Sequence, residues 1–184
     1  YKNSTHALSQ TGITCLTKNT PAANAASPVL TTVEASVFLA NPDLAEEVFG
    51  PYSILVQCDN DVQLVEVWKS IKGQISTTIM GSDNDLATNK NLLEIATTIA
   101  GRVLLNGVPT GVEVCDSMVH GGPYPASTDS RFTAVGVKAV KRWLRPISFQ
   151  NWPDHLLPSY LQNKNELGVW RTINGDFTKS DVSI

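Results

Sequence analysis

The side chains that most often carry chemistry in proteins are sparse in this sequence. Cys15, Cys58 and Cys115 form no Cys-x-x-Cys pair and show no Cys/His spacing typical of a metal site. His6 and His155 likewise have no partner at the spacing of metal ligands. We therefore predict no metal site, and the odd, sparse cysteine count favours a reducing, cytoplasmic compartment.

The run EEVFGP, residues 46–51, places a carboxylate, an aromatic ring and a Gly-Pro turn within one short segment. Asn41 and Pro42 suit the start of a helical turn just before it. The carboxylate of Glu47 offers only hydrogen-bond acceptors, and the ring of Phe49 offers a flat apolar face. From these residues alone, a helix end with a solvated glutamate, a core phenylalanine and an ordinary turn is the simpler interpretation.

A second candidate region is the glycine- and proline-rich segment 107–125, which has no helical or strand period. A loop of this length inside a compact domain is usually functional or disordered. His120 precedes the pair Gly121-Gly122 in this loop. It is either a surface histidine or a group that favours an acidic ligand, because imidazole gains a proton near neutral pH.

Composition narrows the class of protein. The 184 residues suit one domain with tails, and 42% of them are hydrophobic, as in an ordinary globular protein. A net charge of −3 argues against a general nucleic-acid binder and against a polybasic membrane surface. No apolar run reaches the roughly 18 residues of a membrane span. Since the sequence has no initiator Met, we expect a processed, truncated or partial chain.

Alternating strand-like and helix-like patterns predict an α/β fold with a largely parallel sheet and flanking helices. Strands are predicted at 13–17, 29–33, 35–39, 53–57, 75–80, 103–105 and 144–150, and helices at 61–72, 89–100 and 135–143. Gly73 and Gly101 are placed to end the first two helices. The wholly apolar strand 103–105 is expected in the sheet interior, and Pro146 restricts strand 144–150 to an edge. We expect an N-terminal segment and linker at 1–27, a partial domain at 28–160 and a tail at 161–184.

Several motifs in a fixed order resemble one enzyme family. EEVFGP resembles the E-x-F-G-P signature of aldehyde dehydrogenases, and GRVLLNG, residues 101–107, with the later Gly-Gly pair resembles their approach to the C-terminus. The fuller text GRVLLNGVPTGVEV…HGGPYPASTDSRFTAVG…KRWLRPISFQNWP looks most like the branch that contains α-ketoglutaric semialdehyde dehydrogenases, with NADP-dependent fatty aldehyde dehydrogenases as near relatives. The resemblance covers roughly residues 30–160 and implies the C-terminal part of a catalytic domain.

The resemblance also implies roles for individual residues. Glu47 would accept hydrogen bonds from the nicotinamide ribose of NAD or NADP, and Phe49 would lie beside the nicotinamide ring. The part of the loop that faces the aldehyde would contain Pro109, Thr110, Gly111 and His120. None of the three cysteines stands in a motif that matches the family's nucleophile, so no catalytic residue is expected in this chain.

We carry three hypotheses from the sequence. The first is a C-terminal piece of an aldehyde dehydrogenase that is inactive alone and whose intact form uses NAD or NADP. The second is a non-catalytic structural or dimerisation module of the same fold, and an upstream G-Q-x-C-type segment would distinguish the two. The third is an unrelated α/β small-molecule-binding domain. A homo-oligomer is expected through the segment from Leu144 to Trp152 (LRPISFQNW), whose apolar side chains are too many for a free edge.

Overall fold

The computed structural model describes residues 9–17 and 23–183, and it divides into two compact units, Tyr1–Trp143 and Leu144–Ile184. His6 and residues 19–22 of the expected linker lie outside the described residues. In the described part of the chain, no helix is long and apolar enough to cross a membrane. Each unit is described by itself below.

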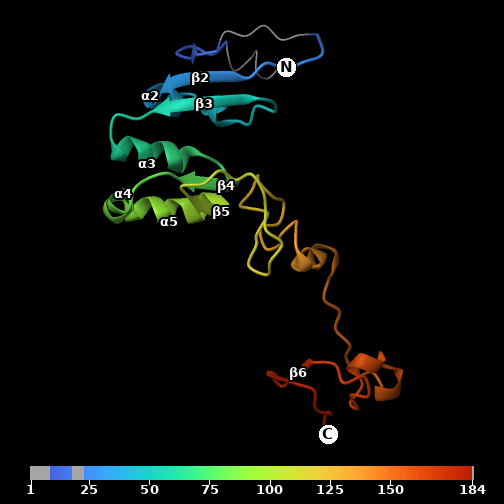
Figure 1. The fold of residues 1–184 in the computed structure, drawn as a ribbon. Helices are drawn as coiled ribbons and strands as arrows, with labels where there is room; N and C mark the ends of the chain where they lie inside the picture. The colour runs from blue at the N-terminus through green and yellow to red at the C-terminus, as the bar shows by residue number, and fades with distance from the viewer. Residues whose placement is uncertain (1–8, 18–22, 184) are drawn as a thin grey trace. The chain divides into compact units, whose positions relative to one another are not determined.

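The strands of the first unit form two small sheets (Figure 1). In one, β2 (Val29–Glu34) pairs in parallel with β3 (Tyr52–Gln57), and the short β1 (Thr14–Cys15) runs antiparallel to β2. In the other, β4 (Gln74–Ile79) pairs in parallel with β5 (Ala100–Leu105). The class is therefore mixed α/β with some parallel pairing, as predicted, although the parallel strands lie in two sheets.

Five helical segments connect these strands: α2 (Ala35–Ala40), the 3-10 helix η1 (Pro42–Ala45), α3 (Asp61–Ser70), α4 (Asp83–Thr88) and α5 (Lys90–Ile99). Local capping explains where two of them begin. The side chain of Asn60 accepts a hydrogen bond from the Gln63 amide at the start of α3. Ser82 and Asp85 form a reciprocal capping box at the start of α4, a helix that the hydrophobic pattern did not predict.

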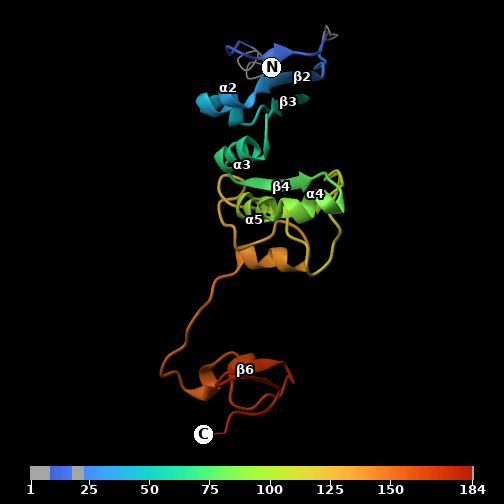
Figure 2. The same cartoon turned by 90° about the vertical axis from the view of Figure 1, so that its left-hand side faces the viewer.

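Helix α3 joins two apolar clusters. The first contains the buried residues Val33, Ala35, Phe38, Leu44 and Val67. The second contains Ile95, Ile99 and Ala100, and Val65 and Trp68 of α3 pack against it. Figure 2 shows α3 between the β2–β3 layer and the β4–β5 layer. The apolar side chains of this helix thus pack on two sides, Val67 in the first cluster and Val65 and Trp68 against the second.

The predicted strand 35–39 is wrong, because this segment is the helix α2. Its β-branched and aromatic residues favour a strand locally, but Ala35 and Phe38 are both buried at a spacing of three residues. One helical turn brings these two side chains to the same face and into the first apolar cluster. Burial therefore overrides the local propensity.

The expected interior position of strand 103–105 is also wrong for the described residues. Strand β5 pairs only with β4 there, and Leu105 is 53% exposed. Strands on both sides would be needed to bury it fully.

The two glycines predicted to end helices have another role. Helix α3 ends at Ser70, three residues before Gly73, and α5 continues directly into β5, which contains Gly101. A Cβ on Gly101 would lie 2.1 Å from the carbonyl oxygen of Gly121, and one on Gly73 would lie 2.1 Å from that of Pro123. A Cβ on Gly122 would likewise lie only 2.2 Å from the carbonyl oxygen of Gln74. The Gly-Gly segment can therefore lie directly against the first residues of β4 and β5.

The end of the first unit and the start of the second differ in detail from the prediction. The helix expected at 135–143 is the 3-10 helix η2 (Val137–Trp143). The strand expected at 144–150 is not formed, and all its residues are exposed. A strand needs a hydrogen-bonded neighbour, and the described residues provide none for this segment.

The second unit is a small hairpin with two short 3-10 helices, η3 (Asp154–Leu156) and η4 (Ser159–Leu161). Strands β6 (Arg171–Ile173) and β7 (Asp176–Thr178) pair around Asn174 and Gly175, which have φ of 53° and 98°. This hairpin was not predicted, although Asn-Gly between strand-like residues is a strong hairpin signal.

Side chains that hydrogen-bond the backbone hold the second unit together, and Arg171 makes three of these bonds. Arg171 donates hydrogen bonds to the backbone carbonyls of Gln162, Asn163 and Ser180. None of the described residues of this unit is fully buried. Asn165 adds hydrogen bonds to the carbonyls of Val169 and Lys179. Hydrogen bonds from side chains to the backbone, more than an apolar core, therefore hold the shape of this unit.

Candidate functional site

The segment that carries Glu47 is held by its neighbours on both sides. Asn41 caps η1 by accepting a hydrogen bond from the Asp43 amide, and Leu44 anchors this turn in the first apolar cluster. After Glu47, Gly50 turns the chain with φ of 138°, a conformation that glycine adopts without strain. The predicted helical turn after Asn41 is thus confirmed, and it leads the glutamates to the surface immediately before β3.

Glu47 lines a cleft of about 470 Å³. The opposite walls are formed by the start of β4, from Lys72 to Ser76, and by Pro125 and Ala126. Phe49 does not line this cleft, and its side chain is 80% exposed. In the described structure Phe49 is therefore not a core residue, and its flat ring is free to contact another molecule.

An ion pair between Glu46 and Lys72 spans the edge of the cleft. The hydrogen bond and then the charge of Glu46 raise the pKa of the Lys72 ammonium above its usual range. Both side chains are mostly exposed, so this pair contributes little to stability. No sequence signal predicts it, because the two residues are 26 positions apart.

His120 is placed by backbone hydrogen bonds on both of its sides. Its amide donates to the Thr133 hydroxyl at 2.9 Å, and its carbonyl accepts from the Ala134 amide at 2.8 Å. Thr133 is only 8% exposed, so the contact is sheltered from water. The imidazole Nδ1 is enclosed and has no hydrogen-bond partner.

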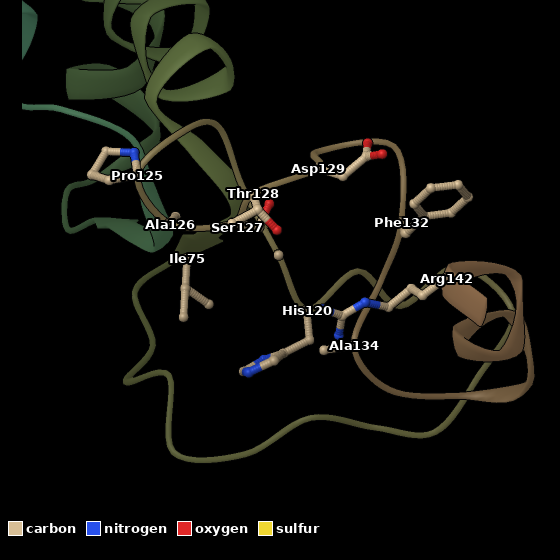
Figure 3. A pocket seen from close by; sticks show the side chains of 11 residues that line it. Ile75, His120, Pro125, Ala126, Ser127, Thr128, Asp129, Phe132, Ala134 and Arg142 are labelled. Carbon is tan, nitrogen blue, oxygen red and sulfur yellow. The ribbon is translucent and has the colours of Figure 1, made fainter.

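The imidazole of His120 lines a second cavity, of about 370 Å³ (Figure 3). Ile75, Pro125 and Ala126 line both this cavity and the cleft of Glu47. The structure thus places Glu47 and His120 on the two sides of one shared wall.

The remaining predicted site residues are not brought into either cavity. Pro109, Thr110 and Gly111 lie in the exposed loop after β5. The loop is tied back at one point, where Arg102 donates to the Gly111 carbonyl at 2.6 Å. A Cβ on Gly111 would meet nothing within 4 Å, so few contacts fix the position of this segment.

The cysteines do not gather at the cavities. Cys15 and Cys115 are exposed, Cys58 is half-buried, and none lines either cavity. Burial, followed by the charge of Asp59, raises the pKa of the Cys58 thiol. A thiol that is hard to deprotonate is a poor nucleophile. Among the described residues, no group of three or more His, Cys, Asp or Glu side chains could bind a metal ion.

The chain forms part of an α/β domain with a surface cleft. This domain contains parallel βα units, an E-V-F-G-P turn and a glycine pair packed against two strands. No family model matches the chain. The chain does match curated proteins, among them two dehydrogenases. The α-ketoglutaric semialdehyde dehydrogenase of Acinetobacter baylyi is 47% identical over 156 residues, which are 84% of this chain and 30% of that protein. The α-ketoglutaric semialdehyde dehydrogenase 2 of Azospirillum brasilense is 44% identical over 143 residues, 78% of this chain and 27% of that protein.

The predicted resemblance to aldehyde dehydrogenases, and to their α-ketoglutaric semialdehyde branch, is therefore confirmed. The chain spans about a third or less of the length of these two relatives.

Proposed function

We propose that this chain is the C-terminal part of the catalytic domain of an NAD(P)-dependent aldehyde dehydrogenase. The aldehyde is α-ketoglutaric semialdehyde or a similar compound, and the product is the carboxylate. The observation that carries this proposal is the 47% and 44% identity to two proteins of that name over most of the chain.

The chemistry requires a thiolate to attack the carbonyl, an acceptor for the hydride and a base that activates water. We propose that the nucleophile and the base come from sequence outside residues 1–184. The cysteines are exposed or half-buried and line neither cavity, which supports this proposal. On this basis these residues alone would not oxidise aldehydes.

The cleft of Glu47 has groups that suit the nicotinamide ribose. The carboxylate of Glu47 is exposed and can accept from two hydroxyl donors. Phe49 presents a ring that can restrict the position of the nicotinamide, and NAD or NADP would take up the hydride when bound. We assign Glu47 and Phe49 to the cofactor, and Pro109, Thr110, Gly111 and His120 to the aldehyde.

We further propose that the two small sheets belong to one largely parallel sheet in the complete protein. Strand β5 has an unpaired edge in the described residues, and its apolar Leu105 is more than half exposed. A neighbouring strand would cover that surface and complete the backbone hydrogen bonds.

The direct test uses the complete gene product that carries these residues. Purified protein is mixed with α-ketoglutaric semialdehyde and NAD or NADP, and formation of the reduced cofactor is followed by absorbance. The proposal predicts turnover, with Glu47→Gln slowing the hydride step about tenfold or more in single-turnover experiments, since misplacing the nicotinamide is costly in rate. Glu66→Gln is the matched control, because Glu66 is an exposed carboxylate of α3 that does not line the cleft.

A complete gene product that oxidises no aldehyde would contradict this function. It would favour the alternative, a structural or dimerisation module of the same fold. One observation supports that second function: the segment from Leu144 to Trp152 exposes Leu144, Ile147, Phe149 and Trp152 by 42% to 65%. Retained dimerisation without turnover would identify this alternative.

A further inference from the structure

The cavity around His120 combines nitrogen donors with apolar walls. His120 and Arg142 contribute the nitrogens, and Ile75 and Phe132 contribute apolar surface. In Figure 3 the side chain of Arg142 extends from η2 toward His120. Such a mixture suits a small molecule with one anionic end and a short carbon chain.

His120 lines this cavity, and its imidazole has an unused hydrogen-bonding atom. The hydrogen bonds of His120 to Thr133 and Ala134 involve only its backbone and fix the position of the residue. They leave the enclosed Nδ1 without a partner. An enclosed polar atom is costly unless something binds it, so a ligand that hydrogen-bonds Nδ1 would remove this cost.

The guanidinium of Arg142 is also unpaired among the described residues, which give it no ion pair or hydrogen bond. The one acidic side chain in the cavity lining, Asp129, is already bound by Arg131. Its carboxylate accepts from the backbone amide, Nε and Nη2 of Arg131 at 3.1, 2.9 and 2.6 Å. These hydrogen bonds lower the pKa of Asp129 to about 2, so its carboxylate stays ionised. Its charge is balanced by that of Arg131 in the ion pair. The exposed guanidinium of Arg142 is therefore open to an external anion.

We propose that this cavity binds the carboxylate end of an acidic aldehyde, with Arg142 as the cation and His120 as a second hydrogen-bonding group. The proposal rests on the proposed function and adds a specificity-determining residue, Arg142. A guanidinium can bind a carboxylate through two parallel hydrogen bonds. The carbon chain would lie against Ile75 and Phe132. α-Ketoglutaric semialdehyde has the required form, with a 2-oxo acid at one end and the aldehyde at the other.

Binding is tested on the 184-residue chain with 2-oxoglutarate as the probe, which has the same 2-oxo acid end. Saturable binding is expected by calorimetry, with shifts of the His120 side-chain resonances by NMR. Arg142→Gln should weaken binding about tenfold or more, since a charge-assisted hydrogen bond is lost. Lys141→Gln is the control, because Lys141 is an exposed neighbour in η2 that does not line the cavity. Circular dichroism checks that each variant is folded.

The absence of saturable binding to the unsubstituted chain, or equal binding by the Arg142 and Lys141 variants, would overturn the proposal. A second arm uses the complete gene product and compares α-ketoglutaric semialdehyde with uncharged pentanal. Arg142→Gln should lower kcat/KM about tenfold or more for the acidic aldehyde, and less than about twofold for pentanal. Equal losses for both aldehydes would also overturn it. If the unsubstituted gene product oxidises neither aldehyde, the proposed function fails, and the 2-oxoglutarate measurement still decides whether the cavity binds a carboxylate.

Discussion

Replacing Gly101 with alanine tests whether the Gly-Gly segment must lie directly on β5. The new Cβ would stand 2.1 Å from the Gly121 carbonyl oxygen, 2.7 Å from its carbon and 3.0 Å from the Gly122 Cα. All three atoms are backbone, so no side-chain rotation relieves the overlap. Overpacking of this kind costs about 3 kcal/mol, and the smaller entropy of the unfolded alanine chain offsets about 0.5–1 kcal/mol. We expect the free energy of unfolding to fall by about 2 kcal/mol.

Urea unfolding followed by circular dichroism measures this change, and a thermal melt should show Tm lower by about 4–8 °C. Gly111→Ala is the matched control, because a Cβ at Gly111 meets nothing within 4 Å. That variant should be as stable as the unsubstituted chain, or slightly more stable. If Gly101→Ala behaved like Gly111→Ala, the Gly-Gly segment could not lie against the start of β5, and the enclosure of the cavities would need another explanation.

Three further outcomes are expected. The chain should dimerise at micromolar concentration in sedimentation equilibrium, and the double substitution Ile147→Asp, Phe149→Asp should abolish the dimer. A chain that stays monomeric to about 100 μM would exclude an interface through the segment from Leu144 to Trp152. In an NMR titration the pKa of the Asp129 carboxyl should be near 2, and it should return toward 3.8 in Arg131→Gln. Because the pKa is lower in the folded state than in the unfolded state, the pair's contribution to folding stability is present above about pH 4 and is lost as the pH falls through about 2. Cys58, whose pKa is raised by burial, should react with iodoacetamide at pH 8 more slowly than the two exposed cysteines. Mass spectrometry of the peptides measures the three rates, and equal labelling of Cys58 would contradict this expectation.

The parts of the fold that sequence predicted well are those fixed by neighbours along the chain. Helix α3 follows from its apolar stripe and the Asn60 cap, and η1 follows from Asn41 and Pro42. Strands β2, β3 and β4 follow from their β-branched residues. In each case the deciding interactions lie within a few residues.

The failures depend on partners that are distant in sequence or absent from the described residues. Segment 35–39 looks like a strand until the burial of Phe38 is known. Gly101 looks like a helix end, because its close neighbour Gly121 is 20 residues further on. The candidate site shows the same limit: motif resemblance pointed to Glu47 and His120, whereas no motif pointed to Arg142. Only the fold brings its side chain to the cavity of His120.

The hydrogen bonds of Arg171 predict how the sequence of the second unit can vary among homologous proteins. The three groups that it binds are backbone carbonyls of Gln162, Asn163 and Ser180, and every residue type supplies such a carbonyl. Substitutions at those three positions should therefore be tolerated as far as this contact is concerned. Arg171 itself has no equivalent substitute, since lysine lacks the planar guanidinium that can donate to three carbonyls from two chain segments at once. Selection for this contact should accordingly act on Arg171 more strongly than on the three positions whose carbonyls it binds.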